Sequence, residues 1–444
     1  MNISWLDRGP RVGAEPAARD GGHPQDGLKV DCVSASTEAD PGHKAYRAGT
    51  HRTVAPAETL ARVRPLMPAM GITRIANITG LDHVGIPVVM VCRPNSRSIA
   101  VSQGKGLTLE AAKASGLMEA VETFHAESIT RPLILGTARE LDRSHSLANI
   151  DELPRAMASR YCPDEPILWI EGHDLGGGSS HWLPYEFVHT DYTLPPGPAS
   201  GYFPANTNGL ASGNHLLEAV SHGVCEVIER DATTLWMQGG ERFRQGRVIR
   251  LDSVDDSACQ ELLARFARAR VAVRAWDTTS DVGVASFYCL VMGQADGFVD
   301  PEFGGGCHPA RQVALLRALT EAGQARTTYI AGSRDDFGRE DYSVAGRSRR
   351  HRRCRMLMDT GAEERDFQDV PSCESDTLRE DVEWVLRRLR SAGIQQVLVV
   401  DLTKPEFGIP VVRVVVPGLE GPDKGGRGDY VPGPRAHAAR QGER

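Results

Sequence analysis

Paired cysteines are missing from this sequence. It contains nine cysteines, an odd number, and they are widely spaced with no C-x-x-C pair. Such spacing does not support a disulfide framework or a zinc knuckle. We interpret each cysteine as a small buried apolar residue or a free thiol.

Long apolar runs and an excess of positive charge are missing as well. No apolar run approaches the roughly 20 residues of a membrane span, and the opening residues MNISWLDRGPRVGAEP contain no hydrophobic signal core. The net charge of −7 does not favour binding to nucleic acid or to an anionic membrane. We therefore expect a cytoplasmic protein whose partners include neither nucleic acid nor a membrane.

The sequence also lacks a G-x-x-x-x-G-K-[ST] motif, so it has no ordinary Walker nucleotide site. Its 444 residues, 41% of them apolar and 25% charged, are typical of a soluble globular protein with one large domain or two to three ordinary ones. Residues 1–43 and 422–444 are rich in small and polar residues and show no periodicity. We predict that both are flexible tails.

Between these tails, patterns typical of strands and helices alternate, and we find no internal repeat. This alternation predicts a mixed α/β fold for residues 44–421. Periodicity predicts helices at residues 109–128, 215–238, 309–332 and 377–393, and strands at residues 86–92, 284–292, 395–403 and 409–418.

Three of the predicted helices share one design, in which a polar face lies opposite an apolar stripe. Positions three and four residues apart are neighbours on a helix. One such face is ordinarily just solvated, but its repetition in three helices favours a shared site. The polar faces contain Ser115, Glu119 and Glu122 in the first helix, Glu218, His222, Glu226 and Glu229 in the second, and Arg317, Glu321 and Gln324 in the third.

If the three faces converge, at least five carboxylates share one cleft. Like charges at that density raise one another's pKa values, so the cleft needs cations inside it. Oxygen ligands with few cysteines or histidines indicate Mg²⁺ rather than zinc, and several Mg²⁺ ions imply a polyphosphate ligand. Gly-rich segments at residues 104–106 and 301–310 could present backbone N–H groups to an anion, or be plain turns.

These motifs together resemble a known family. SGLMEAVE (residues 115–122), GLASGNHLLEAVSHGVCEVIERDA (residues 209–232) and RALTEAGQAR (residues 317–326) are similar, in order and spacing, to the three ATP-binding motifs of YcaO-domain proteins. The resemblance covers residues 44–421. It implies an α/β, YcaO-type ATP-binding fold, in which mixed sheets carry acidic helices that line a nucleotide cleft and hold ATP through several Mg²⁺ ions.

The resemblance also implies a role for individual residues, although it provides no covalent nucleophile. Asn214 matches an asparagine that faces the nucleotide, and Lys44 is expected to reach the phosphates from the N-terminal edge. The implied Mg²⁺ ligands are Glu119, Glu122, Glu226, Glu229 and Glu321, and the implied nucleotide contacts are Lys44, Ser115, Asn214, Arg230, Gln324 and Arg326.

The chemistry that the family implies is ATP-dependent activation of a peptide backbone amide. Its branches are azoline formation, thioamidation with external sulfide and a TfuA-type partner, and support of methylthiolation of a ribosomal protein. Azoline-forming members commonly end in a PxPxP tail, whereas this chain ends VPGPRAHAARQGER, and residues 46–88 are similar to the TfuA-associated subgroup. The resemblance favours thioamidation of a ribosomally made precursor peptide, with a TfuA-like protein and a second copy of the chain as candidate partners.

Two alternatives stay open. The chain could be an azoline-forming cyclodehydratase, or a non-catalytic peptide-binding scaffold, although its intact acidic motifs argue against the scaffold. The basic run GRSRRHRRCR (residues 346–355) could bind an acidic leader peptide or a partner, or it could be a solvated loop.

Overall fold

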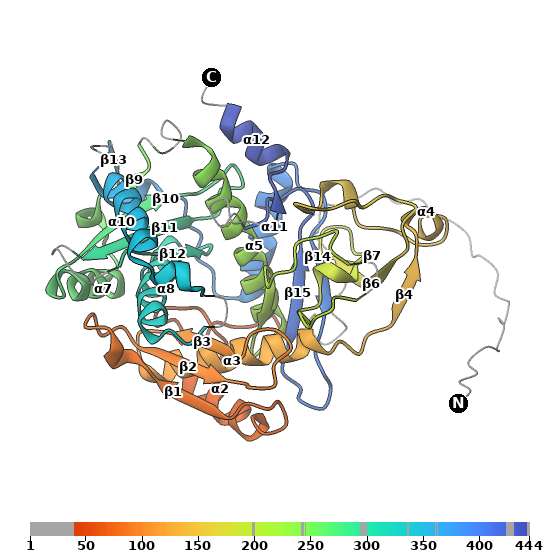
Figure 1. The fold of residues 1–444 in the computed structure, drawn as a ribbon, viewed down its shortest axis with the longest axis horizontal. Helices are drawn as coiled ribbons and strands as arrows, with labels where there is room; N and C mark the ends of the chain where they lie inside the picture. The colour runs from red at the N-terminus through yellow and green to blue at the C-terminus, as the bar shows by residue number, and fades with distance from the viewer. Residues whose placement is uncertain are drawn as a thin grey trace.

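The computed structural model describes residues 40–441 except 198–199, 241–243, 245, 294–299, 335–336, 360, 362 and 423–429. Residues 1–39 and 423–429, which belong to the predicted tails, therefore lie outside the described residues. In the described part, strands and helices alternate (Figure 1), and the predicted mixed α/β class is confirmed. No helix of this part has the length and apolarity that a membrane span needs.

The strands of the described residues form three larger sheets and one small one. The three-stranded sheet has the order β1 (Arg74–Asn77), β2 (Val88–Cys92), β3 (Val101–Lys105). The five-stranded sheet has the order β12 (Glu302–Cys307), β11 (Ser286–Gly293), β10 (Val271–Asp277), β9 (Val248–Ile249), β13 (Glu364–Arg365). The six-stranded sheet has the order β4 (Leu133–Gly136), β6 (Ile167–Asp174), β14 (Leu398–Asp401), β15 (Val411–Val415), β8 (Leu210–Ser212), with β7 (Ser180–Pro184) beside β6, and β5 (Arg155–Ala156) pairs with β16 (Tyr430–Val431).

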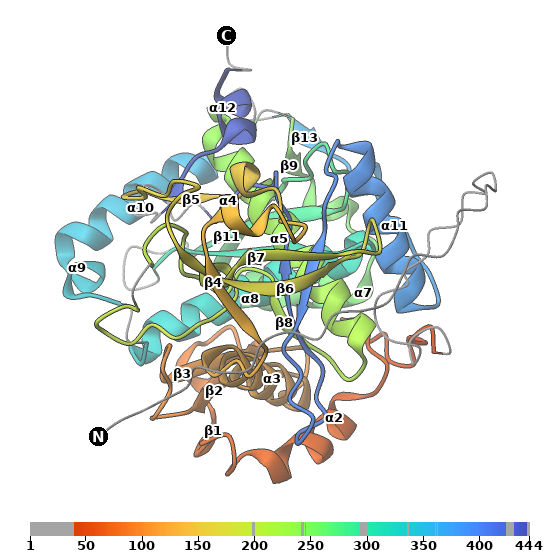
Figure 2. The same ribbon diagram turned by 90° about the vertical axis from the view of Figure 1, so that its right-hand side faces the viewer.

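The helices predicted from periodicity lie close to where the sequence placed them. They are α3 (Leu109–Glu127), α5 (Leu216–Gln238), α8 (Arg311–Ala331) and α11 (Leu378–Ser391). The views in Figure 1 and Figure 2 show α3 against the three-stranded sheet and α5 in the middle of the molecule. The remaining α-helices are α2 (Pro56–Val63), α4 (Ala138–Leu141), α7 (Ser257–Arg268), α9 (Arg339–Tyr342), α10 (Val344–Asp359) and α12 (Pro434–Gln441).

Glycine brings two of the acidic helices into backbone contact with their sheets. A Cβ atom at Gly104 of β3 would lie 2.0 Å from the Ala112 carbonyl oxygen of α3. A Cβ atom at Gly304 of β12 would lie 2.2 Å from the Ala322 nitrogen of α8. Both distances are far below van der Waals contact, so only glycine fits. The Gly-rich segments are therefore largely strands packed closely against helices. Their glycines are explained by this close packing rather than by the predicted anion-binding loops.

The structure contains an internal repeat that the sequence analysis did not find. In each half, three antiparallel strands precede a helix, as β1–β2–β3–α3 and as β10–β11–β12–α8. The edge-strand N–H of Gln103 lies 3.4 Å from the Glu119 carboxylate, and that of Gly305 lies 3.5 Å from the Glu321 carboxylate. Each pair is separated by 16 residues. The prediction of no repeat was wrong because the two halves share geometry more than residues.

The C-terminal segment is not the flexible tail predicted from its composition, at least at residues 430–441. Arg435 donates two hydrogen bonds to Asp231 of α5, both 2.9 Å long, and Asp231 is fully buried. Glu420 accepts hydrogen bonds from the N–H groups of Gly433 and Ala436. Composition could not reveal this anchor, because the partner that fixes the helix lies far away in the sequence.

The ion pair between Arg435 and Asp231 predicts a loss of stability. Arg435→Met should lower the free energy of unfolding by about 3 kcal/mol, because it leaves a buried carboxylate without its counter-charge. Arg440→Met is the matched control on the same helix, since Arg440 is exposed, and it should change stability by less than about 0.5 kcal/mol. Urea unfolding measures both, and equal stabilities of the two variants would contradict the anchoring role.

Candidate functional site

The polar faces of α3, α5 and α8 meet at a cavity of about 610 Å³. The N-terminal segment before α2, strands β3 and β8, the start of β12 and residues that follow α8 also contribute to its wall. Nine of the eleven site residues predicted from the sequence line it, namely Ser115, Glu119, Glu122, Asn214, Glu226, Glu229, Arg230, Glu321 and Gln324.

Glu226 is the least compensated carboxylate of the cavity. Among the described residues, its side chain forms no hydrogen bond and no ion pair, and burial raises its pKa above the usual range. Glu119 has only the long contact with the Gln103 N–H, and burial raises its pKa to about 7. Carboxylates that are buried without partners are costly, so these two groups are prepared to receive a cation.

Two further carboxylates have protein partners that orient them. Ser212 donates to Glu122 from its N–H at 2.9 Å and from its hydroxyl at 2.7 Å, yet burial still raises the Glu122 pKa to about 8. Glu218 accepts from the Thr53 N–H at 3.0 Å and from the Asn214 amide at 3.3 Å. Glu218 thereby fixes the orientation of the asparagine that the sequence placed at the nucleotide.

Cationic side chains cover the remaining carboxylates. Arg230 lies 3.1 Å from Glu229, and Lys105 of β3 pairs with Glu321 of α8. Burial alone would raise the Glu321 pKa, but Lys105 and Arg230 outweigh it and lower that pKa below its usual range. The cavity therefore offers both acidic oxygens for metal ions and cationic groups for phosphate oxygens.

His222 is neutral at physiological pH. Burial, followed by the charge of Arg317, lowers its pKa well below the usual value. Its Nε2 consequently accepts a hydrogen bond of 3.0 Å from the Arg317 guanidinium. This bond holds Arg317 at the cavity wall, where it is placed to meet an anionic group.

The structure does not bring Lys44 and Arg326 into the cavity, contrary to the prediction. Arg326 makes two hydrogen bonds to the Asp82 carboxylate, at 3.0 and 2.9 Å, and all of these groups are buried. Lys44 lies 2.6 Å from the Asp381 carboxylate of α11 and donates to Ser375. Both cations are held in ion pairs that connect segments of the fold, so neither is available to a phosphate.

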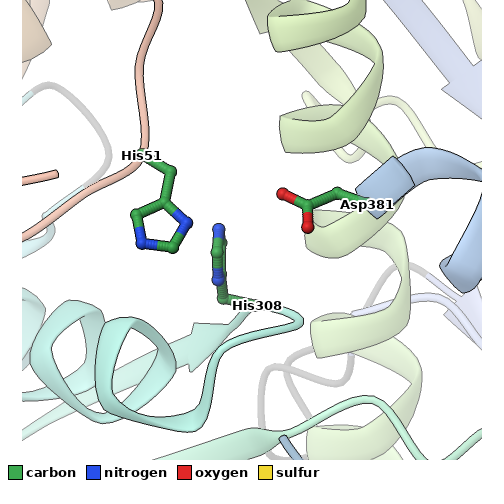
Figure 3. A group of neighbouring side chains, drawn as sticks. All are labelled: His51, His308 and Asp381. Atoms are coloured by element: carbon green, nitrogen blue, oxygen red, sulfur yellow. The ribbon is translucent and has the colours of Figure 1, made fainter. Parts of the chain in front are cut away.

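Asp381 also lies beside two imidazoles, as Figure 3 shows. One ligand atom each of His51, His308 and Asp381 lies within 4.8 Å of the other two. However, the Lys44 ammonium already neutralises the carboxylate, and the Ala310 N–H donates to Nδ1 of His308. A metal ion would have to displace both contacts. We therefore interpret the cluster as a junction that ties the N-terminal segment to α11.

Five further cavity residues were not among the predicted ligands or nucleotide contacts. Three of them lie on the polar faces of the predicted helices, and the other two lie outside those helices. Glu218, His222 and Arg317 share the faces of the predicted ligands, so helical spacing was a usable signal for them. Lys105 and Arg52 lie outside the helices; the Gly-rich segment 104–106 was a weak signal for Lys105, and nothing in the local pattern of Arg52 indicates the cavity. The residues concerned are Arg52, Lys105, Glu218, His222 and Arg317.

The donor set of the cavity fits Mg²⁺. Mg²⁺ prefers oxygen ligands and is commonly bound between one or two carboxylates and the phosphates of a substrate. Glu119, Glu122 and Glu226 provide such oxygens on facing helices, and their raised pKa values show that the metal-free cavity disfavours three negative charges.

Comparison with known proteins agrees with this geometry. Residues 103–420 match the family described as YcaO cyclodehydratase, ATP- and Mg²⁺-binding. The chain belongs to the YcaO family. A solved YcaO structure from Methanopyrus kandleri, bound with AMPPCP and Mg²⁺, is 25% identical, with a TM-score of 0.68, and the alignment covers 85% of this chain and 95% of that one. ATP and Mg²⁺ are accordingly the cofactors of this YcaO protein.

Further similar proteins bear on which subgroup of the YcaO family this chain resembles. An uncharacterized protein from the tfuA 3′ region of Rhizobium leguminosarum bv. trifolii is 39% identical over 83% of this chain and 88% of its own. An uncharacterized protein of Methanothermobacter thermautotrophicus is 37% identical over 83% of this chain and 95% of its own. A heterocyclase solved in complex with substrate and cofactor is 24% identical with a TM-score of 0.68, over 83% of this chain and 53% of that one, and shows the shared fold. The tfuA-region relative is consistent with the TfuA-associated subgroup.

The uncompensated carboxylate of Glu226 predicts opposite effects on stability and on binding. Glu226→Gln should leave the melting temperature of the metal-free protein unchanged or raise it, because a buried charge is removed. The same variant should weaken binding of Mg²⁺·ATP by at least about 100-fold, because a metal ligand is lost. Glu110→Gln on the exposed first turn of α3 is the charge-matched control. Calorimetry with and without EDTA measures binding, and normal affinity of the variant would show that Glu226 is not a ligand.

The raised pKa values of about 7 for Glu119 and about 8 for Glu122 predict a pH dependence. Their folded-state pKa values exceed the ordinary 4.5, so the folded, metal-free protein binds more protons than the unfolded chain between these limits. Their contribution to stability is present below pH 4.5 and is lost as the pH rises towards 8. Mg²⁺·ATP needs the charged carboxylates, so its stabilising effect should grow over the same interval.

The control for this pH dependence is Glu119→Gln/Glu122→Gln, which cannot titrate at these positions. The melting temperature of the metal-free wild type, relative to this variant, should fall with rising pH. A difference that is constant with pH would show that the two carboxyls do not titrate in this range.

Proposed function

We propose that this YcaO protein uses ATP and Mg²⁺ to activate a backbone amide of a ribosomally made peptide, and that its product is a thioamide. The observation that carries the activation step is the convergence of three acidic helices on one cavity, where Glu226 forms no hydrogen bond or ion pair with the described residues. The 39% identical relative in a tfuA 3′ region supports the thioamide product.

In the proposed reaction, hydrosulfide adds to the amide carbon, and the γ-phosphoryl group of ATP passes to the amide oxygen. Loss of inorganic phosphate then leaves a C=S bond in place of C=O, and ATP becomes ADP. Such a phosphoryl transfer depends on positioning and charge stabilisation rather than on a covalent nucleophile. Bound Mg²⁺ would neutralise charge that develops on the phosphoryl oxygens.

The chain's own residues would position the reacting groups. Glu119, Glu122, Glu226, Glu229 and Glu321 are the proposed metal ligands. Asn214, held by Glu218, would contact the nucleotide, and Arg317, held by His222, would meet the phosphates. Ser115, Arg230 and Gln324 line the same cavity and remain proposed nucleotide contacts. Lys44 and Arg326 are left out because their ion pairs hold them elsewhere.

Azoline formation is the second candidate function, since the family description names cyclodehydratases. Of the described residues 430–441, none lines the cavity, and Arg435 points to Asp231 and Asp281 instead. For residues 430–441, this position gives no support to a C-terminal tail in the active site. A TfuA-like protein and a second copy of the chain remain proposed partners.

Mass spectrometry of a candidate precursor peptide separates these functions. With ATP, Mg²⁺, sulfide and a TfuA-like protein, we expect a gain of about 16 Da, because sulfur replaces oxygen, whereas azoline formation would lose about 18 Da as water. A water loss that needs no sulfide would overturn the thioamide proposal. Absence of peptide-dependent phosphate release from ATP, with intact binding of the peptide, would instead indicate a non-catalytic scaffold.

A further inference from the structure

The basic run that the sequence analysis left open forms helix α10 instead of a loop. Its 16 residues include six arginines and one histidine, and no acidic residue precedes Asp359 at its end. This density of positive charge contrasts with the net charge of −7 for the whole chain. Arginines at neighbouring helical positions repel one another and weaken a helix. The fold therefore either compensates these charges or carries them for another purpose.

The inner face of α10 is compensated by the protein. Arg347 lies 3.0 Å from Asp300, Arg350 lies 3.1 Å from Glu302, and the Cys354 side chain is buried beneath the helix. Arg350 also stacks over the Tyr329 ring at 4.3 Å from the ring centre. These contacts are sufficient to explain why α10 is held against the fold.

The outer face carries charge that those contacts do not need. Arg352 and Arg353 lie three and four residues after Arg349, and Met356 lies four and three residues after them, so the four residues form a single stripe, and all four are exposed. Arg349 pairs with the equally exposed Glu340, and an exposed pair of this kind contributes little to stability. An exposed methionine within an arginine stripe adds an apolar contact of the kind found at binding surfaces.

The helix that carries this stripe borders the candidate active site through its inner face. Glu302, which pairs with Arg350 of α10, also lines the cavity at the start of β12. Figure 1 shows α10 on the side of the molecule where α8 and β12 lie. A polymer that is bound along the outer stripe could therefore extend past the Glu302 wall into the cavity.

We propose that Arg349, Arg352 and Arg353 dock an acidic stretch of the peptide substrate, outside the residue that is modified. Guanidinium groups pair with carboxylates through two parallel hydrogen bonds, so a row of three suits a peptide with spaced Asp or Glu residues. The proposal rests on the proposed function, because the docked peptide is the one whose amide reaches the cavity. It assigns to α10 the retention of the substrate and no part of the chemistry.

The test uses the full chain and a short fluorescein-labelled peptide of alternating Glu and Ala, with a Lys and Ala peptide as the probe control. Arg349→Gln/Arg352→Gln/Arg353→Gln removes the outer charges, and glutamine matches arginine in helix propensity. The matched variant, Arg131→Gln/Arg139→Gln/Arg143→Gln, removes three exposed arginines from the segment between the end of α3 and the residues just after α4, and Figure 1 shows α4 on the opposite side of the molecule from α10.

Fluorescence anisotropy should show that the α10 variant binds the acidic peptide at least about tenfold more weakly, whereas the α4 variant binds like the wild type. Binding should weaken as salt rises, because the stripe is exposed. Equal affinity of all three proteins, or equal loss in both variants, would overturn the proposal. Tighter binding of a short single-stranded DNA than of the acidic peptide would also overturn it, in favour of a nucleic-acid surface.

Failure of this proposal is distinguishable from failure of the proposed function. Mg²⁺·ATP affinity should be the same in the wild type and in both arginine variants, since neither set of arginines lines the cavity. If Mg²⁺·ATP binds and peptide docking is lost only in the α10 variant, the docking surface stands, whatever the product proves to be. If the acidic peptide docks elsewhere while thioamidation proceeds, only the docking surface is wrong.

Discussion

The carboxylates of α3, α5 and α8 repel one another across a cavity of about 610 Å³, and the rest of the structure has to withstand that repulsion. Gly104 and Gly304 allow the outer two helices to lie in backbone contact with their sheets. Lys105 and Arg230 offset part of the negative charge, whereas Glu226 forms no ion pair with any residue in the described part of the chain. The cavity therefore retains uncompensated negative charge. Divalent cations together with a polyphosphate would neutralise this charge, and carboxylate oxygens are suitable ligands for such cations.

Much of this arrangement could be predicted from the sequence, because helical spacing is a local signal. The positions of α3, α5 and α8 follow from apolar periodicity, and Glu119, Glu122, Glu226 and Glu229 follow from their spacing opposite the apolar stripe. Such reasoning cannot identify a residue's partner when that partner lies far away in the sequence. Asp82 is 244 positions away from Arg326 in the chain, and no local pattern reveals that it pairs with that arginine. The same limit explains why Lys44 and the C-terminal helix were misplaced.

The repeated unit of three strands and a helix was hidden for a different reason. Its two copies share the order and antiparallel pairing of their strands, while most of their residues differ. Gln103 and Gly305 are related in this way, since each offers an edge N–H to a glutamate 16 residues later. The traces left in the sequence are short, namely the glycines that allow the close approach and the similar segments EAVE (residues 119–122) and EAGQ (residues 321–324), and glycine alone is a common signal for turns. Geometry therefore revealed a relation that residue patterns could not.

The two units of the repeat differ in charge at one position, and this difference makes the cavity electrostatically asymmetric. Three residues after Glu119 the chain has the carboxylate of Glu122, whereas three residues after Glu321 it has the neutral amide of Gln324. A symmetric pair of half-sites would accept a triphosphate equally well in either orientation. With a charge on one side and a dipole on the other, the two orientations differ in electrostatic energy. The two ends of a polyphosphate would therefore meet different charges in this cavity.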